Sequence, residues 1–149
     1  MPIVNLLKVE TLSVIFYSDN NTALFFLDKN NNMGCLRVLS DIVQRFLKNT
    51  VKDNLSSMVK QVIDHFGKID ILVNFAGVRH LEEAVTFPEP KWNWIMDVNL
   101  KGTFLTCQAV GEVMVQQKKG KIVNVSSVHG LLGRAKDLAY APSSAAINQ

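Results

Sequence analysis

The sequence predicts an α/β fold in which a parallel sheet is flanked by helices. From residue 54 onward, helical patterns alternate with short and almost unbroken apolar runs. Such runs are typical of parallel strands that are buried on both faces, and the short turns between them favour right-handed crossover connections. The 149 residues, 48% of them apolar, are enough to build one hydrophobic core. We therefore expect a single domain over residues 1–149.

The N-terminal third contains the first candidate elements. Leu12 to Tyr17 is β-branched and aromatic, and the turn-forming cluster at 18–21 follows it, which predicts a buried strand. Ala23 to Leu27 fits either a short helix or a second strand, because its periodicity does not decide between them. Residues 36–41 are expected to form a strand and residues 42–47 a helix.

A clearer helix is expected from Asn54 to Gly67, because asparagine is a favourable N-cap and glycine a favourable stop. Six apolar side chains between them recur at intervals of three and four residues and share one helix face: Leu55, Met58, Val59, Val62, Ile63 and Phe66. This face predicts a helix that covers a sheet. A buried strand is expected directly afterwards, from Ile69 to Phe75.

A long helix is expected next, from about Lys91 to Gln117, after Pro88 and Pro90. Its apolar side contains Trp92, Ile95, Met96, Phe104, Leu105, Val110, Val113 and Met114. Gly120 is expected to end this helix, Ile122 to Val125 to form another buried strand, and Tyr140 to lie near the start of a final helix. Ligands of parallel α/β sheets bind at the carboxyl ends of the strands, where this chain carries polar residues.

Composition argues against several classes of function. The net charge of +3 arises from 16 basic and 13 acidic residues that are scattered along the chain, so no nucleic-acid or membrane partner is expected. The two cysteines, Cys35 and Cys107, are too few for a disulfide framework, and no spacing suits a metal. His65, His80 and His129 are expected to be surface or packing residues. We expect a cytoplasmic protein, because no apolar run approaches the roughly 18 residues of a membrane span.

Four short motifs carry the chemistry, and they occur in a fixed order: Asn74-Phe75-Ala76-Gly77, Asp97-Val98-Asn99-Leu100, Ser126-Ser127-Val128, and Tyr140-Ala141-Pro142-Ser143-Ser144. In this order they resemble the short-chain dehydrogenase/reductase family, well over residues 54–146 and weakly over 12–53. The resemblance implies a Rossmann-like sheet that is incomplete here, because the first βα unit and the C-terminal elements are missing. Leu12 to Tyr17 then corresponds to the second strand of the family rather than to its central first strand.

The resemblance also implies roles for individual residues. Tyr140 would be the general acid in carbonyl reduction and the base in alcohol oxidation. Ser127 would orient the substrate oxygen, and Asn99 would hold a water in the proton relay. Asn74, Ala76 and Gly77 resemble a turn that contacts the cofactor, NAD or NADP. Asp19 or Asp41 is a further candidate for the adenine ribose.

Ser144 departs from the family pattern, in which a lysine occupies this position. That lysine favours the deprotonated tyrosine and hydrogen-bonds the nicotinamide ribose, and a serine does neither electrostatically. No Gly-x-x-x-Gly-x-Gly loop exists either, since the first glycine of the chain is Gly34. Such a loop provides the pyrophosphate site at a helix N-terminus. We therefore expect weak or absent cofactor binding and impaired hydride transfer to a small carbonyl or from a secondary alcohol.

Structural alternatives remain for each of these residues. Tyr140 alone fits a half-buried packing residue, Ser126-Ser127 fits turn chemistry, and Asn99 fits a solvent-facing helix position. Two functional alternatives also remain. In the first, the chain is a non-catalytic module that pairs with a full-length relative. In the second, it is a gene fragment without function. The resemblance also implies a homo- or hetero-oligomer that forms through the helices at about 91–117 and 138–149.

Overall fold

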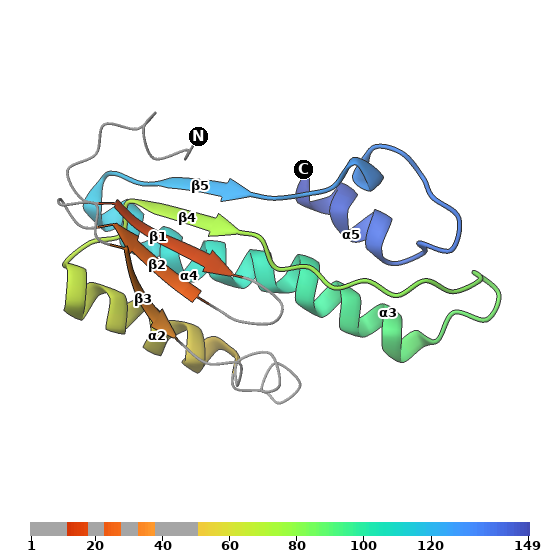
Figure 1. Cartoon of the computed structure of the whole chain (residues 1–149), viewed down its shortest axis with the longest axis horizontal. Helices are drawn as coiled ribbons and strands as arrows, with labels where there is room; N and C mark the ends of the chain where they lie inside the picture. Colours follow the sequence, from red (N-terminus) through yellow and green to blue (C-terminus); the bar gives the residue numbers. More distant parts are fainter. Residues whose placement is uncertain (1–11, 18–22, 28–32, 38–50) are drawn as a thin grey trace.

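The computed structural model describes residues 12–17, 23–27, 33–37 and 51–149 of the chain (Figure 1). The described strands are β1 (Leu12–Tyr17), β2 (Ala23–Leu27), β3 (Met33–Arg37), β4 (Ile71–Asn74) and β5 (Lys121–Asn124). The described helices are α2 (Val51–Phe66), α3 (Glu89–Met96), the π-helix η2 (Asp97–Lys101), α4 (Gly102–Gln117), the 3-10 helix η3 (Val128–Gly130) and α5 (Tyr140–Ile147). The predicted turn at 18–21, the helix at 42–47, and the candidates Asp19 and Asp41 lie outside the described residues.

The described strands form one sheet in the order β3-β2-β1-β4-β5. β1, β4 and β5 run parallel, which confirms the predicted parallel α/β sheet, whereas β2 and β3 pair antiparallel at one side. Ala23–Leu27 is thus a strand and not a helix. β1 lies between β2 and β4, at the centre of the described sheet.

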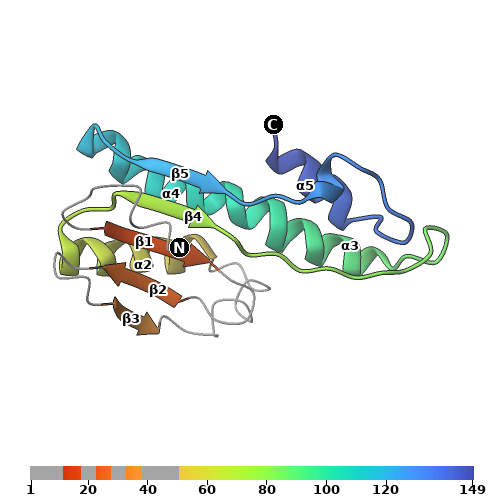
Figure 2. The ribbon, with the colours of Figure 1, turned by 45° about the horizontal axis from the view of Figure 1, so that its top comes forward.

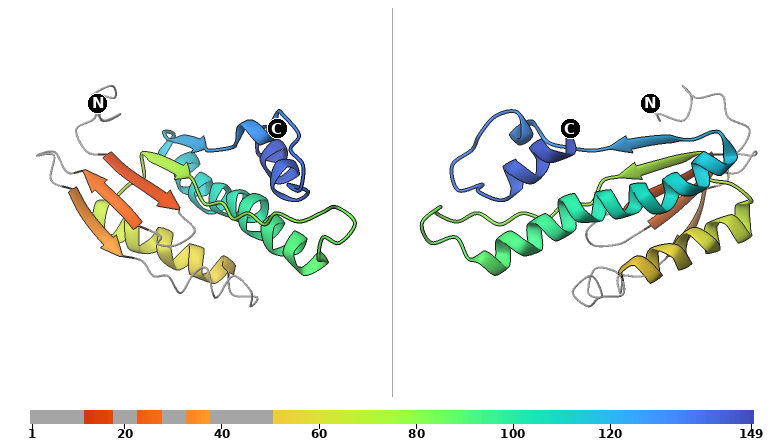
Figure 3. Two further views of the ribbon diagram at one scale, coloured as in Figure 1. Left: turned by 45° about the vertical axis from the view of Figure 1, so that its right-hand side comes forward. Right: turned by 180° about the vertical axis from the view of Figure 1, so that it is seen from behind.

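Two helices, α2 and α4, lie on the same face of this sheet (Figures 2 and 3). The core forms where they meet β4, and it contains the buried side chains of Leu55, Met58, Val59, Val62, Ile69, Leu72, Val110 and Met114. Ile63 and Phe66 pack against it as partly buried residues. The predicted apolar face of α2 is therefore the face that covers the sheet, and each fully buried Leu, Val or Met contributes roughly 1.5–3 kcal/mol.

The start of α2 was predicted wrongly, and its end correctly. Asn54 is not the N-cap, because the helix already includes Val51. Gly67 ends the helix in the left-handed conformation, with φ of 72°, and its N–H donates to the carbonyl of Ile63 at 2.8 Å. Glycine adopts this conformation without steric cost, which explains its place at the helix end.

The long helix expected over 91–117 consists of α3, η2 and α4 in succession. The wider π turn of η2 changes the helical register, and beyond it the buried positions recur every four residues at Gly102, Thr106, Val110 and Met114. Phe104 consequently faces outward with 57% of its surface exposed, against our prediction. The helix ends at Lys118 in the left-handed conformation, two residues before the predicted Gly120.

β5 is more exposed than a buried parallel strand should be. All four of its residues are exposed, including Ile122 at 41% and Val123 at 48%, so the prediction of a buried strand is wrong. The physical reason is its position, because β5 is the last strand of the described sheet next to β4. Among the described residues, no helix is long and apolar enough to cross a membrane.

Candidate active site

A cavity of about 240 Å³ opens beyond the carboxyl ends of β4 and β5. Its lining comes from the turn after β4, from η2, from the end of β5 and from α5, in the residues Phe75, Ala76, Gly77, Asn99, Val125, Ser126, Tyr140, Ser144 and Ile147. Four of the predicted site residues, Ala76, Gly77, Asn99 and Tyr140, are thus brought together around one space. Ser144, at the position of the family's lysine, borders the same cavity.

Asn99 holds the two sides of this cavity together. It lies in the π-helix η2 with only 3% of its surface exposed, so it does not face solvent. Its Oδ1 accepts from the N–H of Val78 at 2.8 Å, and its Nδ2 donates to the carbonyl of Val78 at 3.0 Å and to Ser143 Oγ at 3.1 Å. The side chain thereby joins the loop after Gly77 to helix α5.

Asn74 lies beneath the cavity rather than in its lining. Its side chain is 3% exposed and bridges β4, β5 and α4. Nδ2 donates to Asn124 Oδ1 at 2.8 Å and contacts Cys107 Sγ at 3.2 Å, while Oδ1 accepts from Thr106 Oγ1 at 2.7 Å. Burial raises the pKa of the Cys107 thiol, and its hydrogen bonds to Asn74 and Asn124 lower it by less. This network fixes the strand ends that carry the site.

Ser127 stands at the start of η3, outside the residues that line the cavity. Its Oγ accepts from the backbone N–H of His129 at 3.2 Å, which is the turn chemistry considered above. Ser126 is the serine that borders the cavity, and its Oγ donates to the carbonyl of Ser144 at 2.8 Å. Gly130 brings η3 close to α5, since a β-carbon there would lie 2.8 Å from the carbonyl carbon of Ser144.

The sequence reasoning missed an ion pair beside Tyr140. Arg79 binds Asp137 side-on, with Nε to Oδ1 at 2.9 Å and Nη2 to Oδ2 at 2.7 Å. The Asp137 side chain is fully buried, and it raises the pKa of the guanidinium mainly through this hydrogen bond. The Arg79 guanidinium also lies 5.4 Å from the centre of the Tyr140 ring. The only signal in the sequence was an arginine two residues after a turn that ends a strand.

The histidines differ in their surroundings. His80 packs edge-on against Phe87 at 5.7 Å and lies 3.9 Å from Glu82, as expected of a packing residue. His129 packs against Tyr140, with ring centres 6.3 Å apart. The side chain of His65 lies outside the described part of the chain. Within that part, no group of three or more His, Cys, Asp or Glu side chains is arranged to hold a metal.

Comparison with known proteins decides the family. The model of the short chain dehydrogenases matches residues 28–149. The chain belongs to the short-chain dehydrogenase family. It is 43% identical over 98 residues to an NAD-dependent glycerol dehydrogenase of Listeria innocua, which covers 66% of this chain and 39% of the relative. It is 38% identical over 98 residues to a 5-keto-D-gluconate 5-reductase of Escherichia coli, with coverage of 66% and 39%.

Solved structures share this fold over two thirds of the chain. An NAD+-bound xylitol dehydrogenase superposes with a TM-score of 0.64 at 32% identity, over 66% of this chain and 38% of its own. ElxO with NADP bound superposes with a TM-score of 0.63 at 25% identity, over 66% and 40%. The chain therefore spans about 40% of the length of the relatives that it matches. The family match begins after β1 and β2, so the centre of the sheet lies outside it.

Proposed function

We propose that this chain carries the proton-transfer part of a short-chain dehydrogenase site, which serves hydride transfer between NAD or NADP and a carbonyl or secondary alcohol. One observation carries the proposal: Tyr140, Asn99 and the Ala76-Gly77 turn border one cavity at the carboxyl ends of the parallel strands. This is the edge at which open α/β sheets bind their ligands.

Tyr140 is the proton donor in this proposal. When bound, a nicotinamide cofactor supplies the hydride to the carbonyl carbon. The phenol of Tyr140 gives its proton to the carbonyl oxygen as that oxygen gains negative charge, and the product is an alcohol. Asn99 supports this step by fixing the loop after Gly77 against helix α5. Ser126 borders the cavity at the end of β5, whereas Ser127, which the resemblance assigns to the substrate oxygen, lies outside the cavity lining.

The residues fit a nicotinamide cofactor only in part. Ala76 and Gly77 expose backbone beside the cavity, as a close approach to a nucleotide requires. The cavity of about 240 Å³ is, however, below the roughly 300–1,000 Å³ of ordinary ligand pockets. Ser144 is 3% exposed, and its side chain has no positive charge that could bind the ribose of the cofactor. We infer that the chain by itself binds the cofactor weakly and reacts slowly.

The test is reduction of a small diketone at millimolar NADH or NADPH, followed by the absorbance of the reduced cofactor. Slow turnover above the buffer rate is expected for the unaltered chain, and Tyr140→Phe is expected to abolish it because the phenyl ring has no proton to give. Tyr17→Phe is the matched control, since it changes the other tyrosine of the chain. Equal turnover in the chain and in Tyr140→Phe would contradict the assigned role.

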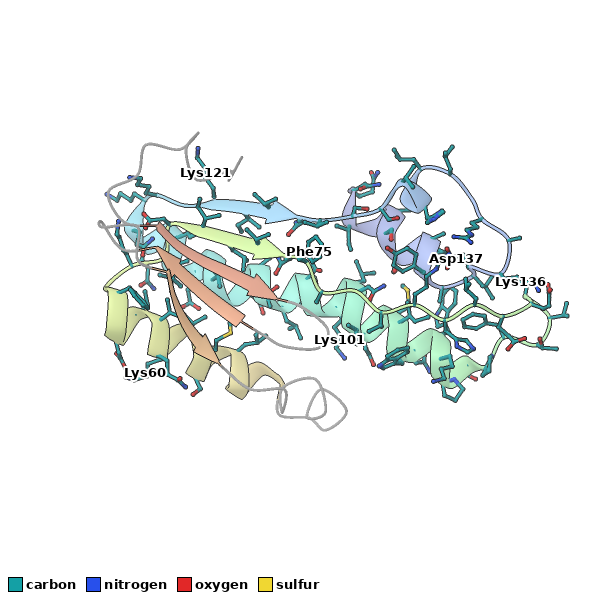
Figure 4. All side chains as sticks on the ribbon, in the orientation of Figure 1. Lys60, Phe75, Lys101, Lys121, Lys136 and Asp137 are labelled. Carbon is teal, nitrogen blue, oxygen red and sulfur yellow. The ribbon has the colours of Figure 1, made fainter. Side chains whose placement is uncertain are left out.

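A second candidate function is supported by the exposed apolar surface at β5. Ile122, Val123 and Val125 are 41%, 48% and 38% exposed, and Phe75, labelled at the end of β4 in Figure 4, is 59% exposed. Exposed apolar strand edges invite pairing with another chain. The alternative is therefore a non-catalytic module that joins a full-length relative. The test is size exclusion with light scattering on the chain mixed with a full-length relative. A defined heteromer supports the module, and aggregation contradicts it.

A further inference from the structure

We propose that the ion pair between Arg79 and Asp137 is a positioning pair for Tyr140, which holds the phenol ring in one orientation at the edge of the cavity. This inference rests on the proposed function, because it takes Tyr140 as the proton donor. Neither Arg79 nor Asp137 belongs to the residues that line the cavity. The pair therefore acts through the tyrosine and not on a bound ligand.

The carboxylate of Asp137 fixes the orientation of the Arg79 side chain. The Asp137 side chain is fully buried, and its two oxygens accept from Arg79 Nε at 2.9 Å and from Nη2 at 2.7 Å. No other described residue donates to this carboxylate. A buried carboxylate without a partner is strongly unfavourable, and a two-bond contact with a planar guanidinium permits one relative geometry. Arg79 is thus held in one place although its side chain is 32% exposed.

The fixed guanidinium lies against the ring of Tyr140. The Cζ atom of Arg79 is 5.4 Å from the centre of the ring, within the range in which an aromatic ring attracts a cation. The ring of His129, from the segment that contains η3, packs edge-on against the same ring, with centres 6.3 Å apart. Two side chains from different segments therefore contact the ring of the proton donor, and both lie outside the cavity lining.

The same aspartate also contacts the backbone next to Tyr140. Asp137 precedes Tyr140 by three residues, and its carbonyl accepts from the N–H of Ala141 at 3.2 Å in the first turn of α5. One residue thus binds both the backbone of this turn and the guanidinium that packs on the ring. The orientation of the ring relative to its own helix is therefore set through Asp137.

Further contacts join the two segments that carry the pair. The N–H of Glu82 donates to the carbonyl of Lys136 at 3.1 Å, and Lys136 Nζ binds Glu83 at 2.7 Å. Lys136 has a left-handed φ of 64°, which is unfavourable for a lysine and persists where neighbouring contacts hold it. Figure 4 shows Lys136 and Asp137 on the segment that leads into α5, next to the loop after β4. These segments form one unit, and Arg79 and Asp137 are the part of it that reaches Tyr140.

A fixed ring affects the chemical step and not substrate binding. Proton transfer requires the phenol to lie within hydrogen-bond reach of the substrate oxygen. A displacement of roughly 1 Å can lower the rate about 100-fold. Because the pair does not line the cavity, its loss should lower kcat and leave KM unchanged.

The first test is fluorine NMR of the full chain labelled with 3-fluorotyrosine, in a Tyr17→Phe background that leaves Tyr140 as the only tyrosine. The resonance is expected to lie away from its position in concentrated urea. Arg79→Lys keeps the positive charge but loses the two-bond geometry, so the resonance should move towards its position in urea. Asp137→Asn should act in the same way. Arg134→Lys, the same change at an exposed arginine before α5, is the matched control and should leave the resonance in place.

The second test is the turnover of a small diketone by the same variants. Arg79→Lys is expected to lower kcat about tenfold and to leave KM within about a factor of two. The double variant Arg79→Lys/Asp137→Asn should lose no more than the weaker of the two single variants, because residues that act as a unit are not additive.

Three results would overturn the positioning pair: a Tyr140 resonance that already lies at its urea position in the Tyr17→Phe chain, equal resonances in Arg79→Lys and Arg134→Lys, or a rise in KM without a loss in kcat. The first comparison needs no change at Arg79 or Asp137, so it stands even if these variants do not fold.

Failure of the pair differs from failure of the proposed function. A Tyr140 resonance that depends on Arg79 in a chain without turnover would remove the redox function and leave the pair. Turnover that depends on Tyr140 but not on Arg79 would remove the pair and leave the redox function.

Discussion

Replacing Asn99 by alanine should destabilise the chain strongly. The side chain is 3% exposed and makes three hydrogen bonds, two of them to the backbone of Val78. Alanine leaves the N–H and the carbonyl of Val78 without these partners, and each unsatisfied buried polar group costs about 1–3 kcal/mol. We expect a loss of about 2–5 kcal/mol in the free energy of unfolding, a large part of the roughly 5–15 kcal/mol typical of a domain.

Urea unfolding followed by circular dichroism measures this loss. Asn93→Ala is the matched control, because Asn93 is an exposed asparagine in the same long helical segment. It should change the free energy of unfolding by no more than about 0.5 kcal/mol. Equal stability of the Asn99 and Asn93 variants would refute the view that Asn99 ties the loop after Gly77 to helix α5.

Further outcomes follow from the contacts of the site. Gly130→Ala should lower the free energy of unfolding by about 1–3 kcal/mol, because the added β-carbon would lie 2.8 Å from the backbone of Ser144. Gly133→Ala is the control, since a β-carbon there meets open space. Equal melting temperatures of the two variants would contradict the close packing at Gly130. In a Cys35→Ser background, Cys107 should react slowly with iodoacetamide at pH 7, because burial raises its pKa above the ordinary value of 9.0. Rapid alkylation at pH 7 would argue against the raised pKa. Because the pKa is higher in the folded chain, the contribution of Cys107 to stability is present below pH 9 and is lost as the pH rises further. Ser144→Lys alone should not raise diketone turnover above the slow rate of the unaltered chain, since no glycine-rich phosphate loop occurs in the sequence. A clear increase over that rate would show that the cation alone was missing.

Local patterns predicted those elements whose neighbours lie nearby in the chain. The apolar face of α2, its glycine stop and the start of the last helix at Tyr140 depend on spacing and backbone chemistry, and all three agree with the structure. The motifs also contain four residues that border the cavity: Ala76, Gly77, Asn99 and Tyr140.

The remaining features depend on tertiary contacts that no local pattern contains. The π turn at Asp97–Lys101 shifts the helical register and turns Phe104 outward, and nothing in the apolar periodicity indicated it. The exposure of β5 follows from its place at the edge of the described sheet. Arg79 and Asp137 are 58 residues apart, so their ion pair becomes visible only when the loop after β4 meets the segment before α5.

The central claim is that this chain keeps a proton-donating tyrosine in a redox cavity but lacks the cation and the phosphate loop that hold a nicotinamide cofactor. Titration of the chain with NADH and with NADPH, followed by the fluorescence of the reduced cofactor, tests it directly. The account predicts binding far weaker than micromolar for both cofactors. Saturation at low-micromolar concentration of either one would contradict it.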